Sequence, residues 1–383
     1  MIRLLSVQPV AERGGSDQAL LRMLRSLPSA EFECHLVVPA DPPLRADFEA
    51  AGVAVHVVPM ARISTSHRAR DWMRYVLGWP VAVARIARLV RRLDVDVVHT
   101  NSLHSWYGWA AAAATRRPHV WHGREIVVQS NAALRVERFL TRRFATLVIC
   151  MSQAIADQLD VDPRKIVVVH ETADPAEFSP GRAGRFRATV GIADDAPLVG
   201  AAGRIDTWKG FDVLLDAHER AVARRPDLQL VVAGGPVAGK EDLFERLRAR
   251  AAALPGAHWL GPRPDIPDLL ADLDVFVLPS TEPEPYGLVV VEALASGAPV
   301  VVTDAGGPRE IAAAATPGSA RLVPPADAAA LADAIVATVE AAGRSTAAGR
   351  RSRPARRDPE PERFAALFRS VCPRRPGNPG RLL

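Results

Sequence analysis

Cysteine is scarce in this chain. Its three cysteines, Cys34, Cys150 and Cys372, lie far apart among 383 residues, and none belongs to a Cys-x-x-Cys pair. This spacing excludes a dense disulfide framework and a cysteine-based zinc site. Because Cys34 and Cys150 lie in apolar runs typical of strands, we expect both to be reduced residues of the core.

Long apolar runs are also missing. None approaches the roughly 18 residues that a membrane-spanning helix needs. Residues 1–7 are too short for a secretion signal, lack a cleavage site and have the pattern of a first strand. We therefore expect a cytoplasmic protein, and peripheral contact with the inner face of a membrane is left open.

Aromatic residues make up only 5% of the chain, whereas hydrophobic residues make up 48%. The apolar volume therefore comes mainly from aliphatic side chains, which suits buried parallel strands covered by alanine-rich helices. The formal net charge of +5 favours anionic partners, namely phosphates, acidic lipids or nucleic acid, without choosing among them.

In the first half of the chain, short β-branched runs alternate with longer helical patterns. Strands are expected at residues 2–7, 33–38, 54–58, 95–100, 119–122, 146–151 and 165–170. Helices are expected at residues 17–26, 80–92, 106–115 and 131–144. This alternation predicts a parallel sheet with helices on both faces.

A stretch rich in proline, glycine and polar residues then marks a linker, and the pattern starts again. The second series has strands at residues 198–202, 229–233, 257–260, 275–279 and 299–303, and helices at 210–224, 240–254, 266–271, 289–296 and 326–342. We therefore predict an α/β chain of two doubly wound domains. Their residues are 1–175 and 176–360, followed by an amphipathic helix at 361–372 and a disordered tail at 373–383.

In doubly wound sheets, ligands bind outside the carboxyl ends of the strands. After the first strand, Gly14 and Gly15 precede a helix. Paired glycines let the backbone approach an anion, and a plain turn is the alternative. After the first strand of the second series, Gly203, Arg204 and Lys209 combine a glycine with two cations. This pattern suits a diphosphate, and two solvated cations are the alternative.

The strongest local motif is a turn and helix start after the fourth strand of the second series. The backbone N–H groups of Gly287, Leu288 and Val289 are expected to point at an anion. Glu284 precedes this helix start, and Glu292 lies within the apolar helix. Because an unpaired carboxylate is costly there, either a ribose diol or a buried salt bridge is expected to hold Glu292.

Other polar residues have less specific patterns. His122 follows a strand, where a catalytic and a structural role are both open. Three Asp-x-Asp triplets, which begin at Asp94, Asp160 and Asp272, resemble metal sites. Two of them precede strands and the third has the pattern of a turn, so we predict no metal site and no cofactor.

Taken together, these residues resemble the retaining GT-B glycosyltransferases of the GT4 type, the glycosyl transferases of group 1. The most specific match is the Glu-x7-Glu motif from Glu284 to Glu292 within EPYGLVVVEALASGAPVV, and the next is GRIDTWKG. Supporting matches are VVHTN, LVICMSQAI, LVVAGGP and DVFVLPS, and the likeness runs from Gly14 to about Val371. The resemblance implies the GT-B fold, in which two Rossmann-like domains face a central cleft.

The resemblance also implies roles for the site residues. Arg204 and Lys209 would hold the donor diphosphate, Glu292 the ribose, and His122 the transferred sugar. Four residues would take part in catalysis, namely His122, Arg204, Lys209 and Glu284, and six would bind the donor, namely Gly15, Gly203, Gly287, Leu288, Val289 and Glu292. The helix near the C-terminus would cross back to the first domain.

The activity implied is transfer of a sugar, with its anomeric configuration retained, from a nucleotide-diphosphate donor to an unidentified hydroxyl acceptor. Such enzymes show no obvious nucleophile, and cations in place of a metal stabilise the leaving diphosphate. One departure from the family is the sequence Glu171-Thr172-Ala173-Asp174, where an Asn-Gly-Val-Asp turn is usual. Because of this departure, the chain could instead be a non-catalytic protein that binds sugar nucleotides. An epimerase on the same scaffold is a further alternative.

Two basic regions are relevant to whether the chain binds a membrane or nucleic acid. Residues 67–92 mix arginines with aromatic and apolar residues. A surface that meets anionic lipid and an ordinary amphipathic helix are both open for this region. The arginine-rich run at residues 350–357 has no interleaved aromatics, so binding of nucleic acid is not expected.

Overall fold

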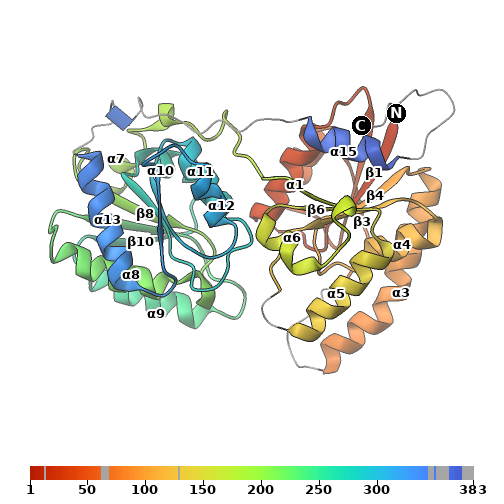
Figure 1. Cartoon of the computed structure of the whole chain (residues 1–383), viewed down its shortest axis with the longest axis horizontal. Helices are drawn as coiled ribbons and strands as arrows, with labels where there is room; N and C mark the ends of the chain where they lie inside the picture. The colour runs from red at the N-terminus through yellow and green to blue at the C-terminus, as the bar shows by residue number, and fades with distance from the viewer. Residues whose placement is uncertain (13, 62–68, 128–129, 344–348, 351–361, 373–383) are drawn as a thin grey trace. The chain divides into compact units, whose positions relative to one another are not determined.

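The computed structural model describes residues 1–12, 14–61, 69–127, 130–343, 349–350 and 362–372. The chain divides into two compact units. The first comprises Met1–Glu171 together with the C-terminal helix α15 (Arg363–Val371), and the second begins at Thr172 (Figure 1). The disordered tail predicted at residues 373–383 lies outside the described residues.

Seven parallel strands form the sheet of the first unit. They are β1 (Ile2–Val7), β2 (Phe32–Val38), β3 (Ala54–Val57), β4 (Val97–Thr100), β5 (His119–Gly123), β6 (Leu147–Cys150) and β7 (Ile166–Val168). Their order is β3-β2-β1-β4-β5-β6-β7. The chain therefore reverses its direction of winding between β1 and β4, and their carboxyl ends mark the switch point at which such sheets bind ligands.

Helices cover both faces of this sheet (Figure 1). They are α1 (Gly15–Arg25), α2 (Arg45–Ala50), α3 (Ala69–Arg92), α4 (Tyr107–Thr115), α5 (Asn131–Phe144), α6 (Gln153–Leu159) and α15. Apolar residues of α1 and α15 share one core with β2, whereas those of α3 and α4 share the core on the other face. The C-terminal helix is thus part of the first unit.

The second unit repeats the design with six parallel strands. They are β8 (Leu198–Ala202), β9 (Gln229–Ala233), β10 (Ala257–Gly261), β11 (Val275–Leu278), β12 (Val300–Thr303) and β13 (Ala320–Val323), in the order β10-β9-β8-β11-β12-β13. Its helices are α7 (Arg187–Val190), α8 (Phe211–Val222), α9 (Glu241–Ala252), α10 (Ile266–Asp272), α11 (Leu288–Ala295), α12 (Pro308–Ala313) and α13 (Ala328–Ala342). Two doubly wound α/β domains are therefore confirmed, with the second switch point between β8 and β11.

Helix α3 is longer than predicted. It begins at Ala69, whereas the prediction began at Pro80 because proline favours the first helical turn. Pro80 instead lies inside the helix, where its ring removes the hydrogen bond to the carbonyl of Val76. Because Val76 is 59% exposed, water can satisfy that carbonyl, and the helix continues through the proline.

Strand β13 was not predicted. Its short segment, ARLV, contains a charge at Arg321, and Leu322 is 42% exposed. Its alternation is therefore too weak to identify from the sequence, and pairing with β12 makes it a strand. The short helices α2, α6 and α12 were missed as well.

Asp272 binds several backbone groups at the amino end of the second sheet. Its fully buried carboxylate accepts backbone N–H bonds from Gly184, Phe186 and Arg187. Nε of Arg350, which is also fully buried, lies 3.3 Å from Asp272 Oδ1. This aspartate of the Asp-x-Asp triplets is therefore structural, and the first arginine of the basic run is a core residue.

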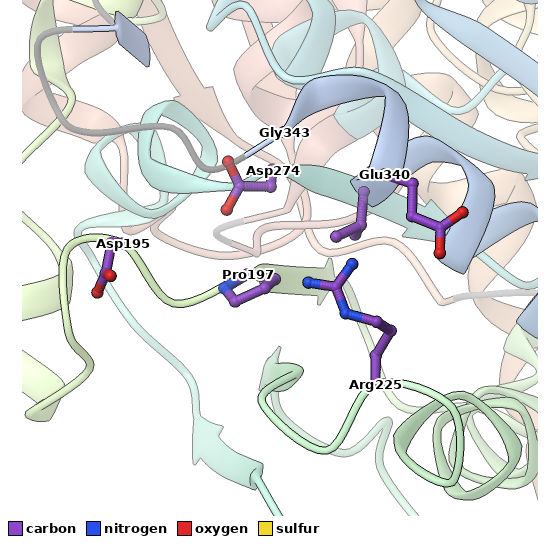
Figure 2. Close-up of a pocket in the computed structure, with 7 residues that line it drawn as sticks. Asp195, Pro197, Arg225, Asp274, Glu340 and Gly343 are labelled. Atoms are coloured by element: carbon purple, nitrogen blue, oxygen red, sulfur yellow. The ribbon is translucent and has the colours of Figure 1, made fainter.

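A cavity of about 200 Å³ lies beside this cluster (Figure 2). Pro197, which directly precedes β8, and Asp274, which directly precedes β11, line it together with Asp195, Arg225, Val339, Glu340 and Gly343. The cavity thus lies at the amino ends of the strands. Since doubly wound sheets bind ligands at the carboxyl ends, we do not assign the donor to this cavity.

The two cysteines predicted to be core residues are buried and carry free thiols. They are Cys34 in β2 and Cys150 in β6. Burial raises the pKa of each thiol to about 12, so both remain protonated and unreactive.

Candidate active site

Lys209 and Glu284 meet at the switch point of the second sheet. Lys209 ends the turn after β8, and Glu284 lies in the turn after the neighbouring strand β11. Lys209 Nζ lies 2.6 Å from Glu284 Oε2, and Ser280 Oγ donates to the same oxygen at 3.0 Å. Only 15% and 10% of the two charged side chains are exposed. The ion pair thus joins two motifs that lie 75 residues apart in the sequence.

The pair leaves part of each group available to a ligand. The ammonium of Lys209 has three N–H donors, of which Glu284 uses one. The same nitrogen lies 4.1 Å from the centre of the Trp208 ring, a cation–π contact that restricts its position. No described residue donates a hydrogen bond to Oε1 of Glu284, so this oxygen can accept one from a hydroxyl.

Two glycines allow the loops around this pair to touch. Gly210 has a φ of 67°, and a Cβ there would lie 2.0 Å from the carbonyl oxygen of Pro279. Gly306 has a φ of 76°, and a Cβ there would lie 2.2 Å from the carbonyl oxygen of Glu284. Gly307 donates its N–H to that oxygen at 2.8 Å. The turn after β12 therefore supports the turn that carries Glu284.

Arg204 lies in the same turn as Lys209. Its side chain is exposed, and within the described part of the chain nothing forms a hydrogen bond or ion pair with it. Gly203, just before it, donates its N–H to Ala233 at 3.0 Å and so anchors the start of the turn. A fixed turn thus presents a guanidinium with free donors, which suits an anion.

Helix α11 begins beside Lys209 and Glu284. Gly287 has a φ of 92° and directly precedes it, so the N–H groups of Leu288 and Val289 open the helix without partners four residues earlier. This end of a helix attracts negative charge. Glu292 lies in the second turn of α11 and is buried, as the sequence predicted. The arrangement can bind a diphosphate between two cations and a helix start.

Polar side chains at the strand ends of the first unit form one network. Asn101, after β4, donates to Gln8 Oε1 at 2.8 Å, and Gln8 donates to Asp17 Oδ1 at 3.1 Å. Arg124, after β5, donates to Asn101 Oδ1 at 2.6 Å and to Glu171 Oε1 at 2.6 Å. Burial raises the pKa of Asp17 to about 6. The network therefore runs from the first turn of α1 to Glu171, the last residue before the chain enters the second unit.

Gly15 and His122 both belong to this first unit. Gly15 is the exposed first residue of α1, two residues before Asp17. His122 in β5 is fully buried, and neither ring nitrogen forms a hydrogen bond. Burial, then the charges of Arg124 and His99, lowers the pKa of His122 well below 6.5, so the ring is neutral. Its contact with a sugar stays a prediction.

The sequence interpretation missed most of this network. Gln8, Asn101 and Arg124 were not assigned to the site, although each is the residue directly after a strand. That position was the available signal, because the carboxyl ends of parallel strands meet at one edge. Glu171 was noticed only as a departure from the family turn, and no local pattern reveals its partner Arg124.

Two family profiles match the chain. The profile described as "Glycosyl transferase 4-like domain" matches residues 14–172, and "Glycosyl transferases group 1" matches residues 196–341. Together they cover both units and most of the chain. The chain belongs to the group 1 glycosyltransferases, the GT4 family. Membership of this family of enzymes, predicted from the Glu-x7-Glu and GRIDTWKG motifs, is thereby confirmed.

Curated relatives of this glycosyltransferase include D-inositol 3-phosphate glycosyltransferases. That of Stackebrandtia nassauensis is 30% identical over 286 residues, which cover 67% of this chain and 63% of the relative. That of Mycobacterium sp. (strain KMS) is 29% identical over 338 residues, which cover 80% of this chain and 75% of the relative. The chain thus spans less than two thirds of the length of the first of them.

Solved structures share the fold of this glycosyltransferase. Anabaena HepE in complex with UDP is 25% identical and covers 97% of this chain and 96% of its own, with a TM-score of 0.75. Sucrose-phosphate synthase from Thermosynechococcus elongatus is 20% identical and covers 96% and 95%, with a TM-score of 0.71. These likenesses support the GT-B fold of two Rossmann-like domains.

Proposed function

We propose that the chain is a retaining glycosyltransferase that moves a sugar from a nucleotide-diphosphate donor to a hydroxyl acceptor. The observation that carries this proposal is the ion pair of Lys209 and Glu284 beside the start of α11. Lys209 has N–H donors left for a phosphate, and Glu284 has an oxygen left for a sugar hydroxyl. One site thus offers contacts to both parts of a sugar nucleotide.

The comparisons give more support for the class of the sugar donor than for the identity of the acceptor. HepE has been solved in complex with UDP and with UDP-glucose. The curated relatives are named for transfer to D-inositol 3-phosphate. We therefore take a nucleotide-diphosphate sugar as the donor and a hydroxyl compound as the acceptor, and UDP and UDP-glucose as the first donor probes.

The chemistry proposed needs no protein nucleophile. The bond between the anomeric carbon and the diphosphate oxygen breaks, and the acceptor oxygen bonds to that carbon on the same face. The leaving phosphate accepts the proton of the acceptor hydroxyl. Arg204, Lys209 and the first amides of α11 stabilise the charge that develops on the diphosphate, and Glu284 orients the sugar.

Donor binding tests the proposal directly. Thermal unfolding of the full chain should shift upward with UDP, GDP or their sugars, because a ligand that binds the folded state stabilises it. At 100 times the dissociation constant the gain is about 2.7 kcal/mol. The same shift should disappear in Arg204→Ala, whereas Arg220→Ala, in α8, should keep it.

Turnover separates the alternatives. Release of nucleotide diphosphate together with a glycosylated acceptor identifies a transferase, and an altered sugar still joined to its nucleotide identifies an epimerase. Donor binding without any turnover would favour the non-catalytic binding protein. If no nucleotide shifts the unfolding transition, the donor site proposed at Lys209 and Glu284 is wrong.

Metal independence is part of the proposal. The two cations and the helix start supply positive charge at the diphosphate, and the carboxylates of the Asp-x-Asp triplets have other partners. Asp94, for example, pairs with Arg3 and Arg117. EDTA should therefore leave the rate of transfer within about twofold of the untreated enzyme. Abolition by EDTA with rescue by Mn²⁺ would contradict this expectation.

We also propose that the first unit docks on an anionic membrane surface through α3. Within the described residues, no helix is long and apolar enough to cross a bilayer. One side of α3 nevertheless exposes Met73, Val76, Leu77 and Val81, which are 53–70% exposed. Exposed arginines flank them at Arg74, Arg85, Arg88 and Arg92. Apolar residues flanked by cations suit a surface of acidic lipid.

His67 and Arg68 lie outside the described residues, and nothing is described of the side chain of Arg70.

Vesicle co-sedimentation tests this surface. The protein should bind vesicles that contain phosphatidylglycerol, and binding should fall as salt rises because charge contributes. Val76→Glu with Leu77→Glu should abolish binding. Leu322→Glu, a matched change at an exposed leucine of the second unit, should not. Equal binding to neutral vesicles, or none at all, would leave α3 as an ordinary amphipathic helix.

A further inference from the structure

Helix α5 exposes apolar residues that docking through α3 alone leaves in water. Phe139 is 62% exposed and Val136 is 40% exposed. They lie three residues apart and therefore share one face of the helix. The one acidic residue of α5, Glu137, is buried. Its exposed charged residues are all arginines, namely Arg135, Arg142 and Arg143. The exposed surface of α5 is therefore apolar and basic, like that of α3.

The N-terminal halves of α3 and α5 lie at the carboxyl ends of the strands. Only four residues separate Arg92, the end of α3, from β4, and two separate Phe144, the end of α5, from β6. Both helices thus end at the amino ends of these strands. With 24 residues α3 is about 36 Å long, and with 14 residues α5 is about 21 Å long. The strands β4 and β6 have four residues each and span only about 13 Å. Both helices therefore reach the carboxyl-end edge of the sheet, and α3 extends past it (Figure 1).

One aromatic contact fixes the level of the two helices relative to each other. Trp109 of α4 stacks on Phe144 of α5 with 4.3 Å between ring centres, and its ring centre lies 6.2 Å from that of Trp79 in α3. Leu77 lies two residues before Trp79, and Phe139 lies five residues before Phe144. They are therefore about 3 and 8 Å nearer to the carboxyl-end edge than this contact.

The exposed apolar residues of both helices thus lie at a similar level, near the edge at which doubly wound sheets bind ligands. We call this group the docking edge. Its members are Met73, Val76, Leu77, Val136 and Phe139.

Charge selects the kind of partner that fits the docking edge. The two helices carry ten arginines and two acidic residues, of which one is the buried Glu137. Arg142 pairs with Asp160, but such an exposed pair has little strength. A second copy of this chain would bring like charges together, whereas acidic lipid headgroups complement them. Nucleic acid is also anionic, but Phe139 is the one aromatic residue of the docking edge on which a base could stack. The combination of aliphatic residues and arginines therefore favours lipid.

We propose that α5 is a second membrane anchor, so that the first unit meets an anionic bilayer with the carboxyl-end edge of its sheet. This inference rests on the proposed docking through α3. One helix alone leaves the unit free to turn about its axis, whereas two anchors at a similar level fix one edge at the surface. The polar network of Asn101 and Arg124, which lies at the same strand ends, is thereby held near the lipid.

The test places an environment-sensitive dye on one cysteine at a time. Cys34 and Cys150 are buried, and their thiols stay protonated. Cys372→Ser removes the remaining thiol, so a cysteine introduced at an exposed position is labelled selectively. The labelled full-length proteins are then mixed with vesicles that contain phosphatidylglycerol.

Three positions are compared in this background, namely Leu77→Cys in α3, Phe139→Cys in α5 and Leu322→Cys in the second unit. The dye emission should rise and shift to the blue at positions 77 and 139, because an anchor buries its apolar face in the lipid. It should stay unchanged at position 322. A dye that remains in water at position 139 while that at 77 enters the lipid would overturn this inference and leave the docking of α3 intact. A dye that enters at neither position would refute both.

Vesicle binding of unlabelled variants gives a second measurement. Phe139→Ala should weaken binding to phosphatidylglycerol vesicles about tenfold, because much of a phenylalanine side chain would no longer be buried in lipid. Leu322→Ala, the matched control, should bind like the wild type. Unchanged binding by Phe139→Ala would contradict a role for α5. Preferential binding to a DNA duplex that is lost in Arg135→Glu with Arg143→Glu, but not in Phe139→Ala, would assign the surface to nucleic acid instead.

These outcomes are independent of sugar transfer. The dye reports contact with lipid whether or not a donor binds, and the thermal shift with UDP or UDP-glucose reports the donor site without vesicles. Insertion at positions 77 and 139 without any donor binding would support the docking edge and refute the proposed donor site. Donor binding without insertion would do the opposite.

Discussion

Lys209→Ala is expected to lower the rate of sugar transfer about 10- to 150-fold, because a hydrogen bond to a charged group is worth about 1.5–3 kcal/mol. The ammonium lies 2.6 Å from Glu284 Oε2, so its loss also frees the carboxylate that is expected to orient the sugar. Ser280 still donates to that oxygen, so the loop should keep its fold. Steady-state kinetics with UDP-glucose and circular dichroism measure the two effects.

Lys240→Ala is the matched control. This lysine precedes α9, and no ion pair links it to a described residue. Its loss removes the same charge from the second unit, but from the loop after β9 and not from the turns after β8 and β11. Its rate should stay within about twofold of the wild type. If Lys209→Ala and Lys240→Ala behave alike, general charge and not the switch-point site governs donor binding.

Asp272→Ala is expected to destabilise the second unit by about 3–5 kcal/mol, the cost of breaking a buried charge pair. Three backbone N–H groups would lose their acceptor, and the guanidinium of Arg350 would lose one of its two carboxylate partners, because it also pairs with Asp194. For a domain of this size the melting temperature should fall by roughly 6–20 °C. Differential scanning calorimetry measures this shift.

The control for Asp272 is Asp216→Ala. Asp216 also pairs with an arginine, Arg250, but its side chain is 49% exposed. Such surface pairs are worth about 0–1 kcal/mol, so the transition should barely move. At a temperature where Asp272→Ala is still folded, it should still transfer sugar, because Asp272 lies at the amino end of the sheet. Loss of activity in the folded variant would show that the amino end of the sheet contributes to the active site.

The sequence interpretation succeeded where a local pattern repeats. Alternation of apolar strands with helical stretches predicted both doubly wound sheets, because burial on two faces requires continuous apolar strands. It failed where local signals are weak or misleading. Pro80 was taken as the first residue of a helix that begins eleven residues earlier at Ala69, and β13 is a strand only through its pairing with β12.

The candidate site likewise has features that the sequence predicts and features that it does not. Glycines and charges in the turns after strands pointed to Arg204, Lys209 and Glu284, since position along the chain suffices to place a residue in such a turn. Position alone could not reveal that Lys209 and Glu284 form an ion pair, because β8 and β11 are neighbours only in the assembled sheet.

The sequence by itself thus determined the fold class, the family and the second-unit residues proposed to bind the donor, since all three depend on local patterns of residue type. Only the tertiary structure decided the partners of the buried charges. Asp272 meets Arg350 and Glu171 meets Arg124 across 78 and 47 residues, and both pairs form only when the strands have assembled into sheets. Burial makes these pairings decisive, because a charge without its partner is costly only where water cannot reach it.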